Sequence, residues 1–258
     1  MDVREVTTDT GIWEPLCIEL DRWKRHGMQA RFWLRDDDAV VPTDALDRLL
    51  ALAGTYSVPI TLAVIPKETG PALARHLSGA PGVTVALHGW SHENHAPSGD
   101  KKQELGMHRG ADVVLEELSK GTEHLAALYG GSFTSVLVPP WNRIDAQLLS
   151  HLTSLGLAGL STFGPERDLP LPVINTHVDL IDWKGTRGGR DAANLVTEIV
   201  DRLRQVFDDG GAVGILSHHL VHDETAWLFI EHLFRLTSRH DGCAWMSLPK
   251  LFSDLHQP

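Results

Sequence analysis

The sequence has few cysteines and no long apolar run. Its two cysteines, Cys17 and Cys243, lie near opposite ends of the chain and lack CxxC spacing, which favours idle thiols in a reducing compartment over a disulfide. No apolar run approaches the roughly 20 residues that span a bilayer. The first residues, Met1 to Glu5, show neither the basic nor the apolar region of a signal peptide. We therefore expect a cytoplasmic protein with no membrane partner.

Basic residues are also scarce relative to acidic ones. The 258-residue chain has 23 Lys and Arg against 34 Asp and Glu, a formal charge of −11. This balance argues against nucleic acid or an anionic membrane surface as the main partner. No GxGxxG motif follows the first predicted strand, so the fingerprint of a dinucleotide-binding fold is missing. The apolar content of 42% suffices for a sizeable core without staples.

Short apolar runs alternate with helical periods along most of the chain. Strands are predicted at 30–36, 58–65, 82–88, 134–138, 157–162, 173–181, 212–217 and 243–248, and helices at 9–27, 43–52, 103–129, 144–155, 192–207 and 224–237. Several strands are apolar on both faces, as in a parallel sheet that is buried on both sides. We predict an α/β fold with parallel strands in a closed or nearly closed barrel, as one domain over 1–258 with a helical N-terminal extension at 1–29.

Chemically capable side chains gather where predicted strands end. They are Asp36, Asp37 and Asp38 after 30–36; His88, His92 and His95 after 82–87; Pro139, Pro140, Trp141 and Asn142 after 134–138; Asp179, Asp182 and Trp183 after 173–178; and His218 and His219 after 212–216. In a parallel barrel these ends share one face, where barrel active sites are built. The repeated placement indicates an active site on that face.

Two of these clusters are suited to a divalent metal. Three adjacent carboxylates repel one another unless a cation or an arginine balances them, although a solvated turn is the alternative interpretation. His88 and His92 are spaced so that two imidazoles can converge on one ion. Two histidines and one aspartate would leave open positions for water and substrate, as a catalytic metal site requires.

Two further segments allow more than one interpretation. His218 follows the apolar strand end Val213–Leu216, and is either a core histidine or a general acid paired with a carboxylate from a neighbouring strand. The segment 185–190, Gly-Thr-Arg-Gly-Gly-Arg, is interpreted as a mobile loop over the site, with anion binding through its backbone N–H groups as the alternative.

Five short motifs follow one another in a fixed order. They are Asp37-Asp38-Ala39, His88-Gly-Trp-Ser-His92, Val138-Pro-Pro-Trp-Asn142, Asp179-Leu-Ile-Asp182-Trp183 and Leu216-Ser217-His218. This order resembles the polysaccharide deacetylase (NodB-homology) family, carbohydrate esterase family 4, over nearly the whole chain. The resemblance implies a distorted (β/α) barrel of seven, mostly parallel, strands. It also implies a hydrolase of carbon–nitrogen bonds that removes an acyl group, expected to be acetyl, from an N-acetylated sugar or related amide.

The resemblance assigns roles to the matching residues. It implies that Asp38, His88 and His92 bind a divalent metal, expected to be Zn²⁺, which activates water and polarises the amide carbonyl. It implies that Asp37 is the general base and that His218 is the general acid. The substrate is then a small molecule or an oligosaccharide. The oligomeric state is not predicted.

The same resemblance extends to the residues around that centre. The backbone N–H of Trp141 would help to form the oxyanion hole, and Asp182 would support the catalytic histidine. Trp90, Pro140 and Trp183 lie beside the motifs and are expected to contact the substrate, since aromatic rings pack on apolar sugar faces.

The sequence departs from the family pattern at three positions. Val138 replaces the family's base-orienting arginine, Asn142 replaces its glycine, and Asp36 replaces its usual aromatic residue. Arg35 and Arg143 are the candidates to compensate for the missing arginine. The Asp36–Asp38 triplet also leaves a one-residue slip in register open.

Three other functions stay open beside the deacetylase. The same metal barrel could hydrolyse a small cytosolic amide, such as a ureide or an imide. Alternatively, Val138 could mark a catalytically decayed, ligand-binding barrel. The third alternative is a purely structural barrel, which would bind no metal.

Overall fold

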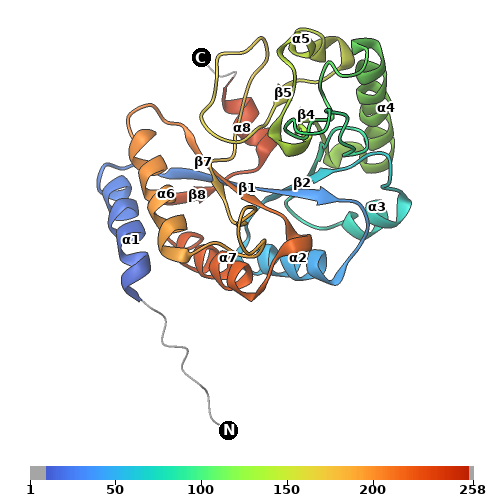
Figure 1. Cartoon of the computed structure of the whole chain (residues 1–258). Helices are drawn as coiled ribbons and strands as arrows, with labels where there is room; N and C mark the ends of the chain where they lie inside the picture. Colours follow the sequence, from blue (N-terminus) through green and yellow to red (C-terminus); the bar gives the residue numbers. More distant parts are fainter. Residues whose placement is uncertain (1–9, 256–258) are drawn as a thin grey trace.

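The computed structural model describes residues 10–255 and shows one parallel β-sheet curled into a half-barrel with helices around it (Figure 1). Seven strands follow one another in the order β5-β4-β3-β2-β1-β7-β6, and β8 pairs with β1 beside that path. The strands are β1 (Ala30–Ala39), β2 (Ile60–Val64), β3 (Val83–Leu87), β4 (Phe133–Leu137), β5 (Gly159–Leu160), β6 (Val178–Asp179), β7 (Ala212–Ser217) and β8 (Cys243–Trp245). The predicted α/β class and the distorted barrel are confirmed.

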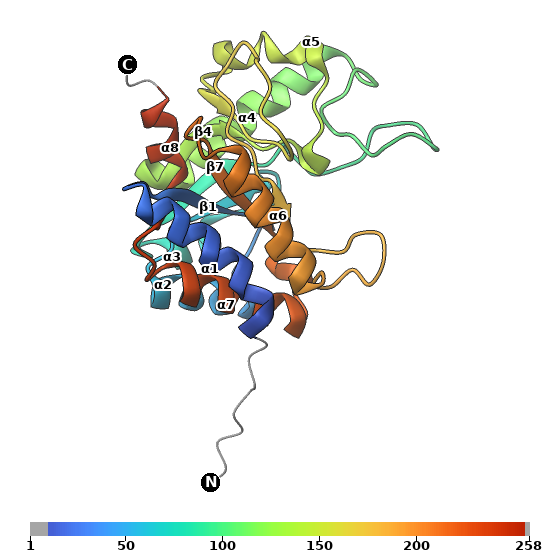
Figure 2. The ribbon, with the colours of Figure 1, turned by 90° about the vertical axis from the view of Figure 1, so that its left-hand side faces the viewer.

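Helices follow most strands and cover the outside of the sheet. They are α1 (Thr10–Arg25), α2 (Asp44–Tyr56), α3 (Pro71–Leu77), α4 (Ala111–Tyr129), α5 (Ala146–Leu149), α6 (Ala192–Gln205), α7 (Glu224–Thr237) and α8 (Leu248–Asp254), with short 3₁₀ turns η1 (Gly130–Ser132), η2 (Pro140–Asn142), η3 (Leu152–Leu155) and η4 (His219–Val221). Helix α1, the described part of the predicted N-terminal extension, lies beside α6 (Figure 2). Residues 1–9 of that extension lie outside the described residues.

Strand β1 is the centre of the sheet and separates two parts of the core by side-chain alternation. Phe32 and Leu34 pack in the large core that includes the outer helices. Trp33 points to the opposite side, into a smaller cluster with Ala63 and Ala86 of the neighbouring strands. Because alternate residues share a face, Arg35 and Asp37 also lie on the Trp33 side, inside the barrel. The strand thus places two buried charged side chains, those of Arg35 and Asp37, inside the barrel near its carboxyl end.

The gap between the outermost strands is bridged by irregular chain rather than by a full strand. Leu160 of β5 pairs with Val173, and Phe163 pairs with Thr176, in isolated parallel bridges. The His177 N–H then donates to Gly214 O of β7. This segment brings the barrel close to closure, although only part of the predicted strand 173–181 is regular.

Several predicted elements are shorter than their apolar periodicity suggested. The predicted helix 103–129 begins only at Ala111, and residues 103–110 form a loop instead. The predicted helix 144–155 divides into α5 and the turn η3. The predicted cap of α2 is confirmed, since the Thr43 side chain accepts a hydrogen bond from Leu46 N at 3.1 Å. Helices α3 and α8 were not predicted.

Both cysteines are free thiols, and Cys243 is buried. Within residues 10–255, no helix combines the length and the apolarity needed to cross a bilayer.

Candidate active site

A cleft of about 620 Å³ opens where the parallel strands end at their carboxyl termini. It is lined by Asp37, Asp38, His88, His92, Lys102, Trp141, Asn142, Arg143, Phe163, Asp179, Trp183, Arg187 and His218. These residues come from β1 and β6 and from the loops that follow β3, β4, β5, β6 and β7. The structure therefore gathers the predicted clusters on one face, as the strand-end pattern indicated.

Asp38, His88 and His92 form one cluster of potential metal ligands. Each offers one ligand atom, and these atoms lie within 4.8 Å of one another. Asp38 Oδ1 lies 3.1 Å from His88 Nε2 and 3.4 Å from His92 Nε2. Two imidazole nitrogens and a carboxylate oxygen are a donor set that suits a catalytic divalent ion, with positions left for water and substrate. The residues present thus fit the predicted metal.

Backbone geometry directs these three side chains toward one point. The pairing of β1 with β2 shifts register between Asp36 and Ala39, and Asp38 there has a φ of 73°. Such a bulge re-aims a side chain at a strand end, and aspartate is among the residues that tolerate the left-handed region. His92 has a φ of 57° in the turn after β3. The ligand set is therefore built from locally irregular backbone on a regular sheet.

The three groups of the cluster are electrostatically coupled. Burial would lower the pKa of His88, but its hydrogen bond to Asp38 and the nearby aspartate charges raise it. Burial alone would raise the pKa of Asp38, but its hydrogen bond to His88 and the nearby histidine charges hold that pKa below its ordinary value. Burial and the neighbouring His88 lower the pKa of His92, which favours the neutral ring that a metal needs. His88 Nδ1 donates to Val138 O at 2.8 Å, so that Nε2 faces Asp38.

Glu104 fixes the loop that carries the two histidines, and sequence reasoning missed it. Its side chain is fully buried, and its carboxylate accepts hydrogen bonds from the backbone N–H groups of Trp90, Ser91 and His92 at 2.8–3.1 Å. Gly89 has a φ of +60°, and a Cβ there would lie 2.3 Å from Glu104 Oε2. Glu104 lies within a segment that was predicted as helix, so no local signal marked it.

Asp37 is held by an arginine from its own strand. Arg35 Nε donates to Asp37 Oδ1 at 2.8 Å, and Arg35 Nη2 donates to Asp37 Oδ2 at 3.0 Å. Arg35 is fully buried, and Nη2 also donates to Asn142 Oδ1 at 2.7 Å. Asn142 has a φ of 56°, a conformation that asparagine tolerates better than most residues. Arg35, one of the two arginines named above as candidates to compensate for Val138, thus contacts both Asp37 and Asn142.

Asp36 points away from the cleft. Its Oδ2 accepts from Ser217 Oγ at 2.5 Å and from the His219 N–H at 2.9 Å, and Oδ1 contacts His219 Nδ1. Burial would raise the pKa of Asp36, but His219 and Ser217 hold it below its ordinary value. In this structure Asp37 and Asp38 line the cleft and Asp36 does not.

His218 lies across the cleft from Asp37. Its Nε2 is 4.0 Å from Asp37 Oδ2, and its ring meets the Trp183 ring edge-on at 4.7 Å between centroids. Its Nδ1 is buried and has no hydrogen-bond partner within the described part of the chain. The histidine therefore presents one nitrogen toward the predicted base.

The expected partnership of Asp182 with His218 is corrected. The Asp182 carboxylate accepts from the N–H groups of Gly185 and Thr186 at 3.0 and 3.1 Å, and so closes an exposed turn. Asp179 is the carboxylate that lies in the cleft and interacts electrostatically with His218. Asp179 Oδ2 accepts from Trp183 Nε1 at 2.9 Å, and burial raises its pKa.

The predicted substrate contacts divide into two groups. Trp141 and Trp183 line the cleft, and the Trp141 ring contacts His92 at 4.4 Å between centroids. Trp141 has a φ of 53°, which is unusual for a bulky residue. Trp90 and Pro140 are not among the residues that line the cleft. Phe163, which sequence reasoning did not single out, lines it instead, with 44% of its surface exposed.

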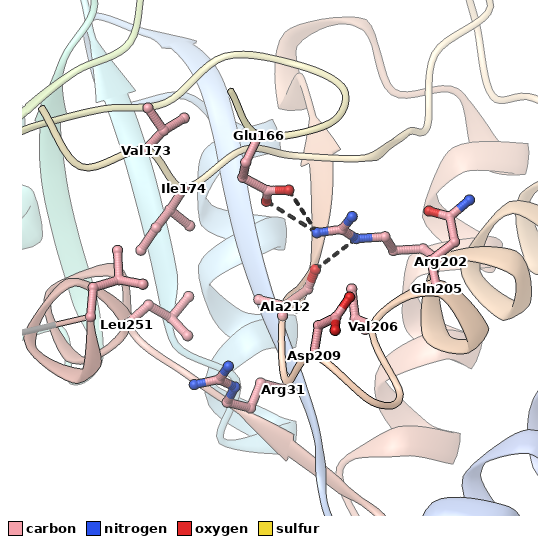
Figure 3. Close-up of a pocket in the computed structure, with 12 residues that line it drawn as sticks. Arg31, Glu166, Val173, Ile174, Arg202, Gln205, Val206, Asp209, Ala212 and Leu251 are labelled. Carbon is pink, nitrogen blue, oxygen red and sulfur yellow. Dashed lines mark hydrogen bonds and ion pairs between the residues drawn. The ribbon is translucent and has the colours of Figure 1, made fainter. Parts of the chain in front are cut away.

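A second cavity, of about 450 Å³, lies at the opposite, amino-terminal end of the strands (Figure 3). There Arg202 donates to both oxygens of Glu166 and to Ala212 O. The floor is apolar and includes Ile174 and Leu251. This cavity contains none of the histidines or strand-end aspartates described above.

The polysaccharide deacetylase family profile matches residues 25–160, just over half of the chain. The chain belongs to the polysaccharide deacetylase family, a family of hydrolases, which confirms the resemblance drawn from the five motifs. No curated protein is significantly similar to the chain in sequence.

Solved structures show the same fold at low sequence identity. A Mycobacterium smegmatis protein provisionally assigned as a polysaccharide deacetylase superposes with a TM-score of 0.67 at 16% identity, over 88% of this chain and 90% of that one. A Bacillus subtilis peptidoglycan deacetylase gives 0.54 at 18% identity, over 88% and 93%. A family 4 acetyl xylan esterase from Clostridium thermocellum, in complex with cobalt, gives 0.53 at 16% identity, over 88% and 93%.

Proposed function

We propose that this protein is a metal-dependent deacetylase that hydrolyses the acyl amide, expected to be an acetamide, of an N-acetylated sugar. The observation that carries the proposal is the joint placement of three elements in one cleft. These are a cluster of two histidines and an aspartate, a second aspartate clamped by a buried arginine, and a histidine 4.0 Å from that aspartate. Metal, base and acid are the parts that metal-assisted amide hydrolysis requires.

Asp38, His88 and His92 are the residues that would hold the ion, and zinc is the ion that we propose. A divalent ion bound there supplies Lewis acidity for the carbonyl oxygen and lowers the pKa of water toward about 7. The clostridial esterase, which has the same fold, is in complex with a cobalt ion, and this supports a metal ion at the present site. The protein's own contribution is orientation, because the Val138 carbonyl fixes the His88 ring and Glu104 fixes the loop below His92.

Asp37 is the proposed general base. Its carboxylate is buried, lines the cleft beside Asp38, and is held by two parallel hydrogen bonds from Arg35. A bidentate guanidinium clamp restricts the rotation of a carboxylate and fixes the direction of its oxygens. Asp37 can therefore take a proton from the attacking water while that water adds to the amide carbon.

His218 is the proposed general acid. It donates a proton to the amide nitrogen as the carbon–nitrogen bond breaks, so that an amine and a carboxylic acid are released. Trp183 and Asp179 position the ring, since Trp183 packs against His218 and donates to Asp179. Asp179 thus takes over, as a proposal, the supporting role that was expected of Asp182.

The remaining cleft residues are proposed to bind the substrate. The Trp141 N–H would donate to the developing oxyanion, because η2 turns the backbone at Trp141 on the wall of the cleft. Trp183 and Phe163 expose 42% and 44% of their surfaces there and offer flat apolar faces to a sugar ring.

The alternatives now have less support. The decayed, ligand-binding barrel depended on Val138 in place of the family arginine, and Arg35 provides that contact from another strand. A small cytosolic amide remains the second substrate class. We also keep the prediction of a cytoplasmic protein, which the two free thiols support.

The decisive experiment measures acetate release from N-acetylglucosamine and its short oligomers by the zinc-loaded protein, in parallel with a panel of small ureides and imides. We expect turnover of the sugars, its loss with a chelator, and its return when zinc is added back. Chelator-sensitive turnover of the small amides alone would replace the sugar substrate. The absence of any chelator-sensitive turnover would reject the proposed activity.

A further inference from the structure

We propose that the cleft selects an acylated substrate that also carries an anionic group, a carboxylate or a phosphate. This inference rests on the proposed function and narrows its substrate class. It depends on three cationic side chains that line the same cleft as the catalytic candidates: Lys102, Arg143 and Arg187. They are called the rim cations below.

The rim cations have no carboxylate partner among the ion pairs shown within residues 10–255. Arg143 Nη1 donates only to the backbone carbonyl of Lys102, at 2.8 Å. Lys102 Nζ lies 5.9 Å from the centre of the Trp141 ring. Arg187 is exposed in the loop after Trp183, and its backbone N–H donates to Asp182 O. The guanidinium groups thus keep most of their donors for a ligand, and guanidinium is well suited to bind carboxylate and phosphate.

The acidic groups of the cleft are already engaged. Asp37 is bound by Arg35, and Asp38 faces two histidines in the proposed metal site. Asp179 is hydrogen-bonded to Trp183 and to the Ile181 N–H. Asp182 does not line the cleft, and its carboxylate accepts hydrogen bonds from the backbone N–H groups of Gly185 and Thr186. None of these carboxylates is paired with a rim cation, so the rim presents positive charge.

The charge of the rim contrasts with that of the whole chain. The whole chain has a formal charge of −11, and most other described arginines are paired with carboxylates. Three cations without a carboxylate partner among the described residues nevertheless line the cleft that the substrate must enter. Such local charge steers and orients an anionic ligand, since charge of one sign at a cleft focuses the field.

The position of the rim fits a sugar with an acidic substituent. Phe163 and Trp183 expose apolar faces in the cleft, and Arg187 follows Trp183 by four residues. A ring that stacks on these aromatic faces with its acetamide at Asp37 and His218 would leave its other substituents near the rim. The backbone N–H groups of 185–190, which the sequence offered as an alternative anion site, are all engaged within the protein. The contact that this loop offers to an anion is therefore the Arg187 side chain.

The test compares matched substrates in the zinc-loaded full-length protein. The probes are N-acetylglucosamine, N-acetylglucosamine 6-phosphate and N-acetylmuramic acid, which are neutral, phosphorylated and carboxylated. We expect kcat/KM to be about tenfold or more higher for an anionic probe, chiefly through KM. This advantage should shrink with added NaCl, because exposed charges are screened over about 8 Å at physiological ionic strength. The two anionic probes show which of the two groups the rim prefers.

Two variants locate the effect. Arg187→Gln should reduce the ratio of anionic to neutral kcat/KM by about threefold, and the double variant Arg143→Gln/Arg187→Gln should reduce it by about tenfold. The control is Arg239→Gln, which removes the same charge from an exposed arginine outside the cleft and should leave the ratio unchanged. The zinc content of each variant is also measured. A rim variant that keeps its zinc but loses the preference for anionic probes excludes direct binding of the anion to the metal as the cause of that preference.

Calorimetric binding of the same three sugars to the zinc-loaded proteins separates this inference from the proposed activity. Tighter binding of an anionic sugar to the wild type than to Arg187→Gln supports the inference even if no probe is hydrolysed. Equal binding of neutral and anionic sugars, or an anionic advantage that survives in the double variant, overturns it. Equal kcat/KM for the neutral and anionic probes overturns it as well, while leaving the deacetylase activity intact.

Discussion

The two ends of the barrel differ in how their charges are balanced. At the amino-terminal end, Arg202 is held by both oxygens of Glu166 and by a backbone carbonyl (Figure 3). At the carboxyl-terminal end, the buried His218 Nδ1 has no partner among the described residues, and the rim cations have no carboxylate. Both ends have a cavity of several hundred Å³. Volume therefore does not distinguish the two ends, whereas the cluster of Asp38, His88 and His92 at the carboxyl-terminal end does.

The largest expected effect comes from removing a metal ligand at the carboxyl-terminal end. His88→Ala should reduce bound zinc to background and lower kcat/KM by about 10⁴-fold, because the proposed Lewis acid is lost with its ligand. Metal content by mass spectrometry and turnover are measured on the same preparation. Full zinc content in this variant would place the metal elsewhere and remove the basis of the comparison.

The next effect isolates the base from the metal. Asp37→Asn should keep zinc and lower kcat by about 10³-fold, within the range for loss of a general base. The side chain keeps its size, so the Arg35 contact is weakened rather than replaced by a cavity. Turnover and metal content are measured together, and unchanged turnover would exclude Asp37 as the base.

A smaller effect tests the arginine that supports the base. Arg35→Lys should keep zinc and lower kcat by about 10²-fold, because a lysine cannot reproduce the two parallel hydrogen bonds to Asp37. The matched experiment returns the arginine to the family position, in the double variant Arg35→Ser/Val138→Arg. Partial recovery of kcat relative to Arg35→Ser alone would show that the two positions perform one task. Full activity in Arg35→Lys would show that only the charge matters.

The same site shows how far sequence reasoning reached. The order of the motifs located Asp38, His88 and His92, because each follows or ends a strand and parallel strands end on one face. The apolar periodicity predicted the alternation of strands and helices, although it missed α3 and α8 and overestimated the length of irregular elements such as β6. The apolar period of a chain reports which residues face the core, but it does not report where the backbone stops being regular.

The contacts that sequence reasoning missed depend on side chains that meet across the fold. Glu104 belongs to a loop that looked helical, and its partners lie 12 to 14 residues away. The Arg35 clamp needs Asn142, 107 residues along the chain, which no local pattern connects. The exchange of Asp179 for Asp182 has the same origin, because two carboxylates three residues apart are indistinguishable until the turn at Gly185 is known.

The assignment of Asp179 rather than Asp182 as the carboxylate near His218 predicts a smaller effect on kcat. Asp179→Asn should lower kcat by about tenfold through loss of the contact that positions Trp183 and His218, with KM little changed. Asp182→Asn is the matched control, since it removes the same charge from an exposed turn. Its kcat should stay within about twofold of the wild type, as expected for a surface substitution. A larger loss in Asp182→Asn than in Asp179→Asn would restore the original assignment.

The smallest effect concerns the amino-terminal end, where we expect stability to change and catalysis to be unaffected. Burial would raise the pKa of Glu166, but its contacts with His177 and Arg202 lower it to about 2. A carboxyl group whose pKa is lower in the folded state stabilises the fold above its ordinary pKa, and this contribution is lost as the pH falls toward the folded value. Glu166→Gln should therefore reduce the free energy of unfolding at pH 7 by about 1 kcal/mol, discounted for partial exposure. The difference from wild type should shrink between pH 4.5 and pH 2 in urea titrations. A pH-independent difference would show that the Glu166 charge contributes nothing, and a loss of kcat would show that the two ends are coupled.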